Sequence, residues 1–230
     1  MITFESVRKT YPARGGVRVI LRRSSFVVPS GKNLAVIGNN GAGKSTLIRL
    51  FAGSELPDSG RITRRGRISW PLGFAGGIHR LLTGRQNARF IARAYGCDAA
   101  EVIDFVEDFA DLGTYMDMPV TVYSSGMRAR LSFGISMAIK FDTYLVDEST
   151  AVGDSRFRRR ADEIFSERRK TANILMVSHS GGTLKKFCDI GAILANGELV
   201  FYPTVDEALD AHDRMNSLKP GSTDDFDNDW

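Results

Sequence analysis

Short apolar runs and longer amphipathic stretches alternate along most of this chain. The runs that we expect to form strands are residues 2–7, 17–28, 33–37, 143–147, 173–177 and 190–194, followed by a hairpin at Gly197 into residues 199–201. Helical spacing of apolar residues predicts helices at residues 45–52, 154–169, 182–187 and 204–212. Such alternation is typical of an α/β domain with a mainly parallel core sheet. Residues 60–70 predict a β ribbon broken at Gly66, and we expect an antiparallel β subdomain as well.

An all-helical stretch interrupts this alternation between about residues 75 and 125. Residues 83–95 and 99–109 predict two amphipathic helices, with apolar stripes of Phe90, Ile91 and Ala94 and of Val102, Phe105, Val106 and Phe109. Ser124 or Ser125 is suited to cap a third helix that runs to about Lys140. We therefore expect one domain over residues 1–213, a helical subdomain at about 75–140, and a disordered acidic tail over 214–230.

Composition and charge narrow the choice of partners. Hydrophobic residues make up 43% of the 230 residues, enough for a sizeable core, and the net charge is +4. Basic residues gather at 64–67, 156–160 and 168–170, as a patch for an anionic partner or as solvated helix faces. We favour solvated faces and expect no nucleic acid. No signal peptide opens the chain and no apolar run is long enough to span a bilayer, so we expect a cytoplasmic protein that reaches the membrane through a partner.

The apolar run that ends at Ile37 leads into a glycine-rich sequence fitting the P-loop pattern G-x-x-x-x-G-K-[ST]. The residues expected to bind a nucleotide there are Gly38, Asn39, Asn40, Gly41, Ala42, Gly43, Lys44, Ser45 and Thr46. Backbone N–H groups can wrap a phosphate chain where glycine leaves no Cβ in the way, and the N-terminus of the next helix adds partial positive charge. Lys44 would reach the β- and γ-phosphates, and the Ser45 hydroxyl would ligate Mg²⁺.

Two further strands end in residues suited to phosphate chemistry. Asp147 and Glu148 follow the apolar run 144–146, and His179 comes shortly after the run 174–177. A carboxylate at the carboxyl end of a strand beside the P-loop strand can hold Mg²⁺, and we assign this role to Asp147. Glu148 would orient the attacking water. The same edge of the sheet favours a functional over a structural role for His179, so Lys44, Glu148 and His179 are the expected catalytic residues.

These motifs, in this order and at this spacing, resemble the ATP-binding subunit of ABC transporters over residues 1 to about 213. Residues 123–127, Tyr-Ser-Ser-Gly-Met, stand where that family has its signature sequence L-S-G-G-Q, so the signature positions are Ser124, Ser125 and Gly126. Residues 128–131, 69–73, 82–87 and 151–154 are similar to the subfamily that exports capsular polysaccharide and related lipid-linked polymers.

The resemblance implies further roles. Tyr11 matches the aromatic residue that stacks on adenine, and His179 would hydrogen-bond the γ-phosphate. Ser125 and Gly126 match positions that contact the γ-phosphate of the nucleotide on the other subunit, and Asp154 matches a loop at the dimer interface. Two subunits of the family pair head to tail around two ATP molecules. The implied partners are a second copy of the chain, a polytopic membrane permease and, indirectly, the exported polysaccharide.

One departure from the family concerns a glutamine that normally follows the β ribbon and touches both the Mg²⁺ site and the membrane partner. Between Trp70 and Asn87 the sequence has only Gln86, which we assign to the start of a helix. His79 is a candidate substitute. The sequence does not identify what replaces the glutamine.

The resemblance implies an ATPase that drives capsular polysaccharide export from the cytoplasmic face of the inner membrane. Three alternatives stay open. The chain could serve an exporter of another lipid-linked polymer, of the O-antigen or teichoic-acid type. It could be a non-transport ABC ATPase acting on DNA or ribosomes. The altered signature also fits a nucleotide-gated interaction protein that hydrolyses ATP poorly.

Overall fold

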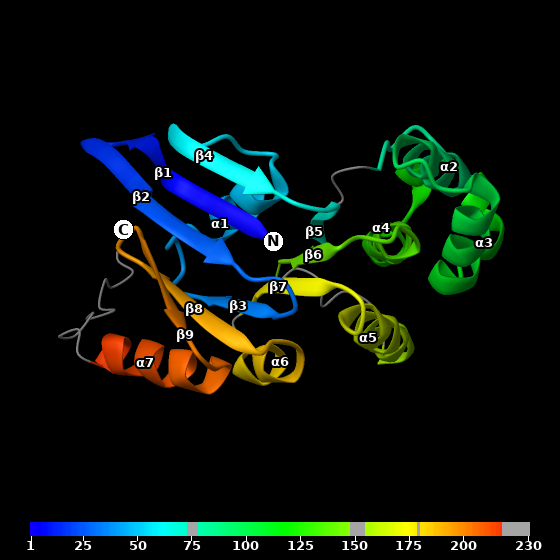
Figure 1. Cartoon of the computed structure of the whole chain (residues 1–230). Coiled ribbons are helices and arrows are strands. Elements are labelled where there is room, and N and C mark those ends of the chain that lie inside the picture. Colours follow the sequence, from blue (N-terminus) through cyan, green and yellow to red (C-terminus); the bar gives the residue numbers. More distant parts are fainter. Residues whose placement is uncertain (73–77, 148–154, 179, 218–230) are drawn as a thin grey trace, which may run out of the picture.

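Two sheets and a group of helices make up the part of the chain that the computed structural model describes, residues 1–72, 78–147, 155–178 and 180–217 (Figure 1). The smaller sheet is antiparallel and has the strand order β2-β1-β4. Its strands are β1 Ile2–Ala13, β2 Gly16–Val28 and β4 Ser59–Arg64. Because β1 continues past its predicted end at residue 7, Tyr11 lies within this sheet.

The larger sheet has six strands in the order β5-β6-β7-β3-β8-β9. They are β3 Leu34–Ile37, β5 Ile68–Leu72, β6 Thr143–Val146, β7 Asn173–Val177, β8 Ile190–Ala195 and β9 Glu198–Tyr202. Among these described strands, β8 and β9 pair antiparallel and every other pair is parallel. The helices of this α/β body are α1 Lys44–Ala52, α5 Ser155–Arg169, α6 Gly181–Phe187 and α7 Val205–Ser217. The predicted α/β fold with a mainly parallel sheet is confirmed. Parallel strands end at one edge, so the carboxyl ends of β3, β6 and β7 lie together.

The prediction of a ribbon over residues 60–70 is wrong. β4 pairs with β1 in the smaller sheet, whereas β5 pairs with β6 in the larger one. The chain changes sheets at Gly66, where φ is 89°. Just beyond it, the Arg67 N–H donates to Asp142 Oδ2 at 2.6 Å and the Asp142 N–H donates to Arg67 O at 2.8 Å. In the sequence, two short strands joined by a glycine resemble a hairpin. The true partner of the second strand, β6, lies far along the chain, and no local pattern identifies it.

The helical subdomain lies to one side of the two sheets (Figure 1) and contains α2 Gly84–Ala94, α3 Ala99–Ala110 and α4 Ser125–Ala138. Short 3₁₀ turns at Gly113–Asp117 and Val120–Val122 precede α4. The apolar stripe expected for α2 is wrong at Phe90, which is 60% exposed, and at Ala94. The buried face follows Ala88, Ile91 and Ala92, and position 90 lies on the opposite side of the helix.

Two groups of buried apolar residues form the core, one on each face of the larger sheet. Alternate residues of β3 divide between them: Leu34 and Val36 face the group that includes α1 and the smaller sheet, and Ala35 and Ile37 face the other. The second group continues into the helical subdomain, where it includes Val106. The subdomain therefore shares a core with the α/β body.

The end of the chain differs from the prediction in one respect. α7 runs to Ser217, so residues 214–217, expected in the disordered tail, form its last turn. Residues 218–230 lie outside the described part. Within the described ranges, none of the helices combines the length and the apolar character needed to cross a bilayer.

Candidate nucleotide-binding site

The loop between β3 and α1 contains the P-loop motif. Gly41 and Gly43 have φ of 78° and 106°, a backbone region that favours glycine. A Cβ built on Gly38 would meet Leu194 O at 2.5 Å, and one on Gly43 would meet Ile20 Cγ2 at 2.6 Å. Packing against β8 and β2 therefore requires glycine at positions 38 and 43. The same absence of side chains leaves the loop backbone open to a phosphate.

Lys44 begins α1, and only 8% of the residue is exposed. Its Nζ donates to Gly38 O at 2.6 Å and to Asn39 O at 3.1 Å, so the ammonium folds back onto the start of the loop. Phosphate oxygens compensate a buried positive charge better than neutral carbonyls do. This position supports the contact to phosphates that the sequence predicts.

A cavity of about 300 Å³ opens beside the P-loop. Besides P-loop residues, its lining includes Tyr11 from β1, Asp147 directly after β6, and Val177 at the end of β7. Ser45, the predicted Mg²⁺ ligand, also lines the cavity. The topology thus brings together residues that the sequence analysis selected from distant parts of the chain.

Arg18 and Ile20 of β2 line the same cavity, and the sequence analysis missed them. Arg18 is the cross-strand partner of Tyr11, and its Nη2 donates to Gly41 O. An arginine here places a permanent positive charge beside the expected phosphate site. A hairpin that pairs Ala13 with Gly16 also places positions 11 and 18 opposite each other. This register is the signal that could have placed Arg18 beside Tyr11.

Tyr11 is supported by a cluster of charged residues that the sequence analysis did not find. Lys9 Nζ lies 2.6 Å from Glu55 Oε1, 3.4 Å from Asp58 Oδ1 and 5.0 Å from the centre of the Tyr11 ring. The hydrogen bond from Lys9 lowers the pKa of Glu55, and the hydrogen bond from Thr10 lowers the pKa of Asp58. Tyr11 also contributes to the lowered pKa of Glu55. The cluster therefore fixes the tyrosine at the edge of the cavity.

Replacing Lys9 by methionine is expected to lower the free energy of unfolding at neutral pH by about 1–3 kcal/mol, because Glu55 loses a charged hydrogen-bond donor. The pKa of Glu55 is lowered in the folded protein, so this contribution is complete above the ordinary value of 4.5 and declines as the pH falls below it. Urea unfolding on both sides of that pH checks the expectation. Lys170→Met is the control, since its pair with Glu167 is exposed and contributes little. An equal loss for Lys9→Met at both pH values would contradict it.

The signature residues lie at the start of α4. Ser124 is the N-cap, and its Oγ accepts from the Met127 N–H at 3.2 Å, which decides between the two serines proposed as the cap. Ser125 and Gly126 form the first turn, where backbone N–H groups have no partner within the helix and suit an anion. Among the described residues, those that line the P-loop cavity do not include Ser124, Ser125 or Gly126.

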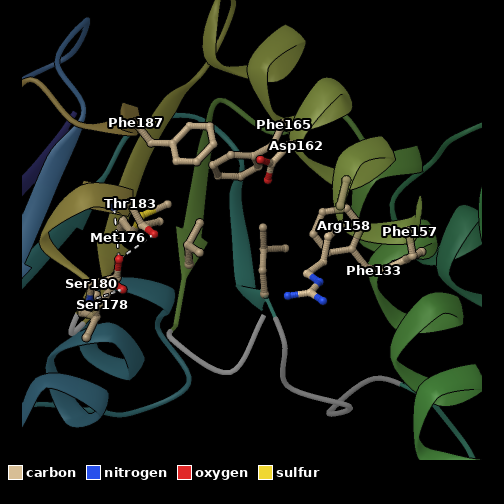
Figure 2. A pocket seen from close by; sticks show the side chains of 14 residues that line it. Phe133, Phe157, Arg158, Asp162, Phe165, Met176, Ser178, Ser180, Thr183 and Phe187 are labelled. Atoms are coloured by element: carbon tan, nitrogen blue, oxygen red, sulfur yellow. Dashed lines mark hydrogen bonds between the residues drawn. The ribbon is translucent and has the colours of Figure 1, made fainter. Parts of the chain in front are cut away.

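Glu148, Asp154 and His179 lie outside the described residues, so their predicted roles stay predictions. Ser178 and Ser180, on either side of position 179, border a second cavity of about 340 Å³ between α5 and α6 (Figure 2). Figure 2 shows Ser178, Ser180 and Thr183 on one side of it and Phe133, Phe157 and Arg158 on the other. Ser180 caps α6 by accepting from the Thr183 N–H at 3.3 Å, and its own N–H donates to Ser178 Oγ at 3.0 Å. These bonds fix the chain on both sides of position 179.

The oxygen donors of the P-loop cavity fit a magnesium ion. The Ser45 hydroxyl and the Asp147 carboxylate are hard ligands, and Mg²⁺ typically takes one or two protein ligands together with phosphate oxygens and water. In the described ranges, no group of three or more His, Cys, Asp and Glu residues could hold a metal by itself. Ser45 and Asp147 would therefore hold the ion jointly with the nucleotide.

The fold and the site define a class of protein. A P-loop follows strand β3 of a mainly parallel sheet, and an antiparallel sheet brings Tyr11 to the same cavity. Asp147 also lines this cavity, but it follows β6, which β7 separates from β3, so the expectation that its strand lies directly beside the P-loop strand is wrong. This arrangement is that of a P-loop nucleotide-binding domain. The family described as "ABC transporter" matches residues 21–151, more than half of the chain. The chain belongs to the ABC transporter family, and the resemblance predicted from its motifs is confirmed.

Individual proteins are similar over nearly the whole chain. The polysialic acid transport ATP-binding protein KpsT of Escherichia coli is 48% identical over 221 residues, which cover 95% of this chain and 99% of KpsT. The capsule polysaccharide export ATP-binding protein CtrD of Neisseria meningitidis serogroup B is 45% identical, with coverages of 94% and 100%. A solved structure described as the ATP-binding subunit of an ABC transporter has a TM-score of 0.72 at 24% identity, covering 97% of this chain and 96% of that one.

Proposed function

We propose that this chain is the ATP-hydrolysing subunit of an ABC transporter that exports capsular polysaccharide across the inner membrane. The observation that carries the proposal is the cavity where Tyr11, the P-loop and Asp147 meet. It occurs in a chain that is 45–48% identical to proteins named for polysialic acid transport and capsule polysaccharide export. A relative named for O-antigen export is 36% identical over 82% of the chain, which favours the capsule type.

The residues divide the chemistry of ATP hydrolysis among them. Tyr11 stacks on the adenine, while Lys44 and the loop backbone hold the β- and γ-phosphates. Glu148 polarises the attacking water, and His179 hydrogen-bonds the γ-phosphate. Ser45 and Asp147 hold Mg²⁺, which when bound offsets charge on the phosphates.

The site is completed by a second copy of the chain. Ser125 and Gly126 of one subunit approach the γ-phosphate held by the P-loop of the other, with Asp154 at the interface between them. Two observations support this arrangement: the first-turn N–H groups of α4 suit an anion, and these residues do not line the described cavity of their own chain. The homodimer thus contains two ATP sites, each built from both subunits.

The clusters of basic residues at 156–160 and 168–170 do not indicate a nucleic-acid partner. Four of their members form ion pairs with carboxylates: Arg156 with Asp111, Arg160 with Asp108, Arg169 with Asp189 and Lys170 with Glu167. This pairing supports the interpretation of these groups as charged helix faces.

A surface of the helical subdomain offers a place for the membrane permease. Leu81, Met118 and Val122 are exposed large apolar side chains, and Leu81 is 72% exposed. Their two segments are adjacent, because the Val120 N–H donates to Leu82 O at 3.0 Å. Phe90, on α2 and nine residues after Leu81 in the sequence, is also exposed. An exposed apolar surface suits a protein partner, so attachment to the cytoplasmic face of the inner membrane comes through the permease.

Replacing both Leu81 and Val122 by aspartate is expected to release the protein from membranes while ATP binding persists. Both side chains are exposed, so the charges do not disturb the core but oppose an apolar contact. The measurement is fractionation of cells that express the permease, beside cells that lack it. Leu56→Asp is the matched control, because Leu56 is 76% exposed in the α/β body. Membrane association that is independent of the permease, or unchanged in the double variant, would refute the docking surface.

A further inference from the structure

Asn87 is a buried amide whose side-chain hydrogen bonds to described residues all go to one short segment. It lies in the first turn of α2 and is 0% exposed. Its Oδ1 accepts from the His79 N–H at 2.7 Å. Its Nδ2 donates to the carbonyls of His79, Leu82 and Thr83, at 3.1, 3.4 and 2.8 Å. A primary amide has an acceptor end and a donor end. In Asn87 both ends are hydrogen-bonded to residues 79–83.

Residues 79–83 are bonded in turn to the segment that leads to the signature. Three backbone contacts join them: the Val120 N–H to Leu82 O at 3.0 Å, the Thr121 N–H to Arg80 O at 2.9 Å, and an antiparallel bridge between Thr83 and Pro119. Both segments also carry the exposed apolar residues to which we assign the permease. A displacement of one segment therefore moves the other.

The signature follows directly from this paired segment. The Tyr123 N–H donates to Val120 O at 3.1 Å, and the buried Tyr123 hydroxyl donates to Tyr115 O at 2.5 Å. The next residue, Ser124, caps α4. Hydrogen bonds thus lead from Asn87 to Tyr123, and the peptide link to Ser124 continues the connection to the first turn of α4, where Ser125 and Gly126 lie.

We propose that Asn87 is a positioning residue that holds the partner-facing segment 79–83 in a fixed relation to Ser125 and Gly126. Movement of that segment against the permease would then move the signature as one unit and open or close the ATP site of the second subunit. The inference rests on the proposed function, since it requires the signature to act across the dimer. Asn87 would then couple the permease to the ATP site in a region where the family normally uses a glutamine. The glutamine present between Trp70 and Asn87, Gln86, is already bonded in the capping box of α2.

Asn87→Ala is expected to leave ATP binding to the isolated subunit within about twofold, because the P-loop cavity makes no use of this residue. ATP-driven dimerisation should weaken by on the order of ten- to a hundredfold, because Ser125 and Gly126 would be displaced from the γ-phosphate of the other subunit by about an ångström. Asn87→Asp keeps the size and the acceptor but turns an oxygen toward three carbonyls, so it should show the same selective loss.

The experiment uses the full chain with Glu148→Gln, and measures binding of a fluorescent ATP analogue and the dimer dissociation constant in ATP by sedimentation. Asn33→Ala is the matched control. Asn33 is another buried amide, whose Oδ1 accepts from the Ile174 N–H at 2.8 Å, and it precedes β3 at the opposite end of the sheet from the P-loop. It should lower the melting temperature without weakening the dimer.

The outcomes separate the two proposals. If the parent protein does not dimerise in ATP, the shared-site function fails and the inference fails with it. If the parent dimerises and the Asn87 variants dimerise equally well, with only a lower melting temperature, then Asn87 is merely structural and the inference alone is overturned.

A second measurement needs no variant at Asn87 and decides the matter if those variants do not fold. Hydrogen exchange in the parent should slow on ATP-driven dimerisation at the His79, Leu82, Val120 and Thr121 amides together with residues 125–127. Protection confined to residues 125–127 would overturn the inference.

Discussion

Replacing Glu148 by glutamine should reduce ATP turnover by on the order of a hundredfold or more while leaving ATP binding intact. Glu148 directly follows Asp147, which lines the P-loop cavity, and glutamine keeps its size but cannot polarise a water as a carboxylate does. ATP that is bound but not hydrolysed should hold two subunits together. The variant should therefore accumulate as a dimer in ATP and remain a monomer in ADP.

Turnover and molecular mass of the purified protein check this expectation. Glu198→Gln, on an exposed residue at the start of β9, is the control and should behave as the wild type. Wild-type turnover in Glu148→Gln would remove Glu148 from the mechanism. A variant that loses turnover but stays monomeric in ATP would speak against the shared site.

The second large effect concerns a mixed dimer of two inactive chains. Lys44→Ala removes the cation expected on the β- and γ-phosphates, so binding of the triphosphate should weaken. Gly126→Asp places a negative charge where the γ-phosphate of the other subunit must approach. The fold should tolerate that substitution, because a Cβ at position 126 would meet only Ser124 Oγ, at 3.9 Å.

If each ATP site uses both subunits, pairing Lys44→Ala with Gly126→Asp puts both lesions in one site and leaves the other intact. The matched control carries both substitutions on one chain paired with a wild-type chain, which damages both sites. When chains that all carry Glu148→Gln are mixed in ATP and captured through two different tags, the first arrangement should retain about one ATP per mixed dimer, whereas the second should yield neither a mixed dimer nor retained ATP. Equal retention in the two arrangements would exclude the cross-subunit site.

The sequence analysis was correct for features that depend on residues close together in the sequence. The P-loop, the position of Asp147 after a buried strand and the alternation of strands and helices all depend on short windows, and the structure brings Tyr11, Lys44, Ser45 and Asp147 to one cavity. The parallel topology then followed, because strands separated by helices return to the same edge of a sheet.

What the sequence analysis missed depends on contacts between distant segments. The supposed ribbon at residues 60–70 joins two different sheets, because β5 finds its partner in β6. The exposure of Phe90 follows from which face of α2 meets the core. The Lys9–Glu55 pair and the bonds of Asn87 join side chains to loops whose course no local pattern specifies.

The measurement that tests the central claim most directly is polymer export in cells that make the capsular polysaccharide and lack this chain. They are supplied with either the wild type or Glu148→Gln, and the polymer is stained in intact and in lysed cells. Surface polymer should return only with the wild type, and with Glu148→Gln the polymer should be found only after lysis. Normal surface polymer in cells without the chain, or with Glu148→Gln, would contradict the assignment of this ATPase to polysaccharide export.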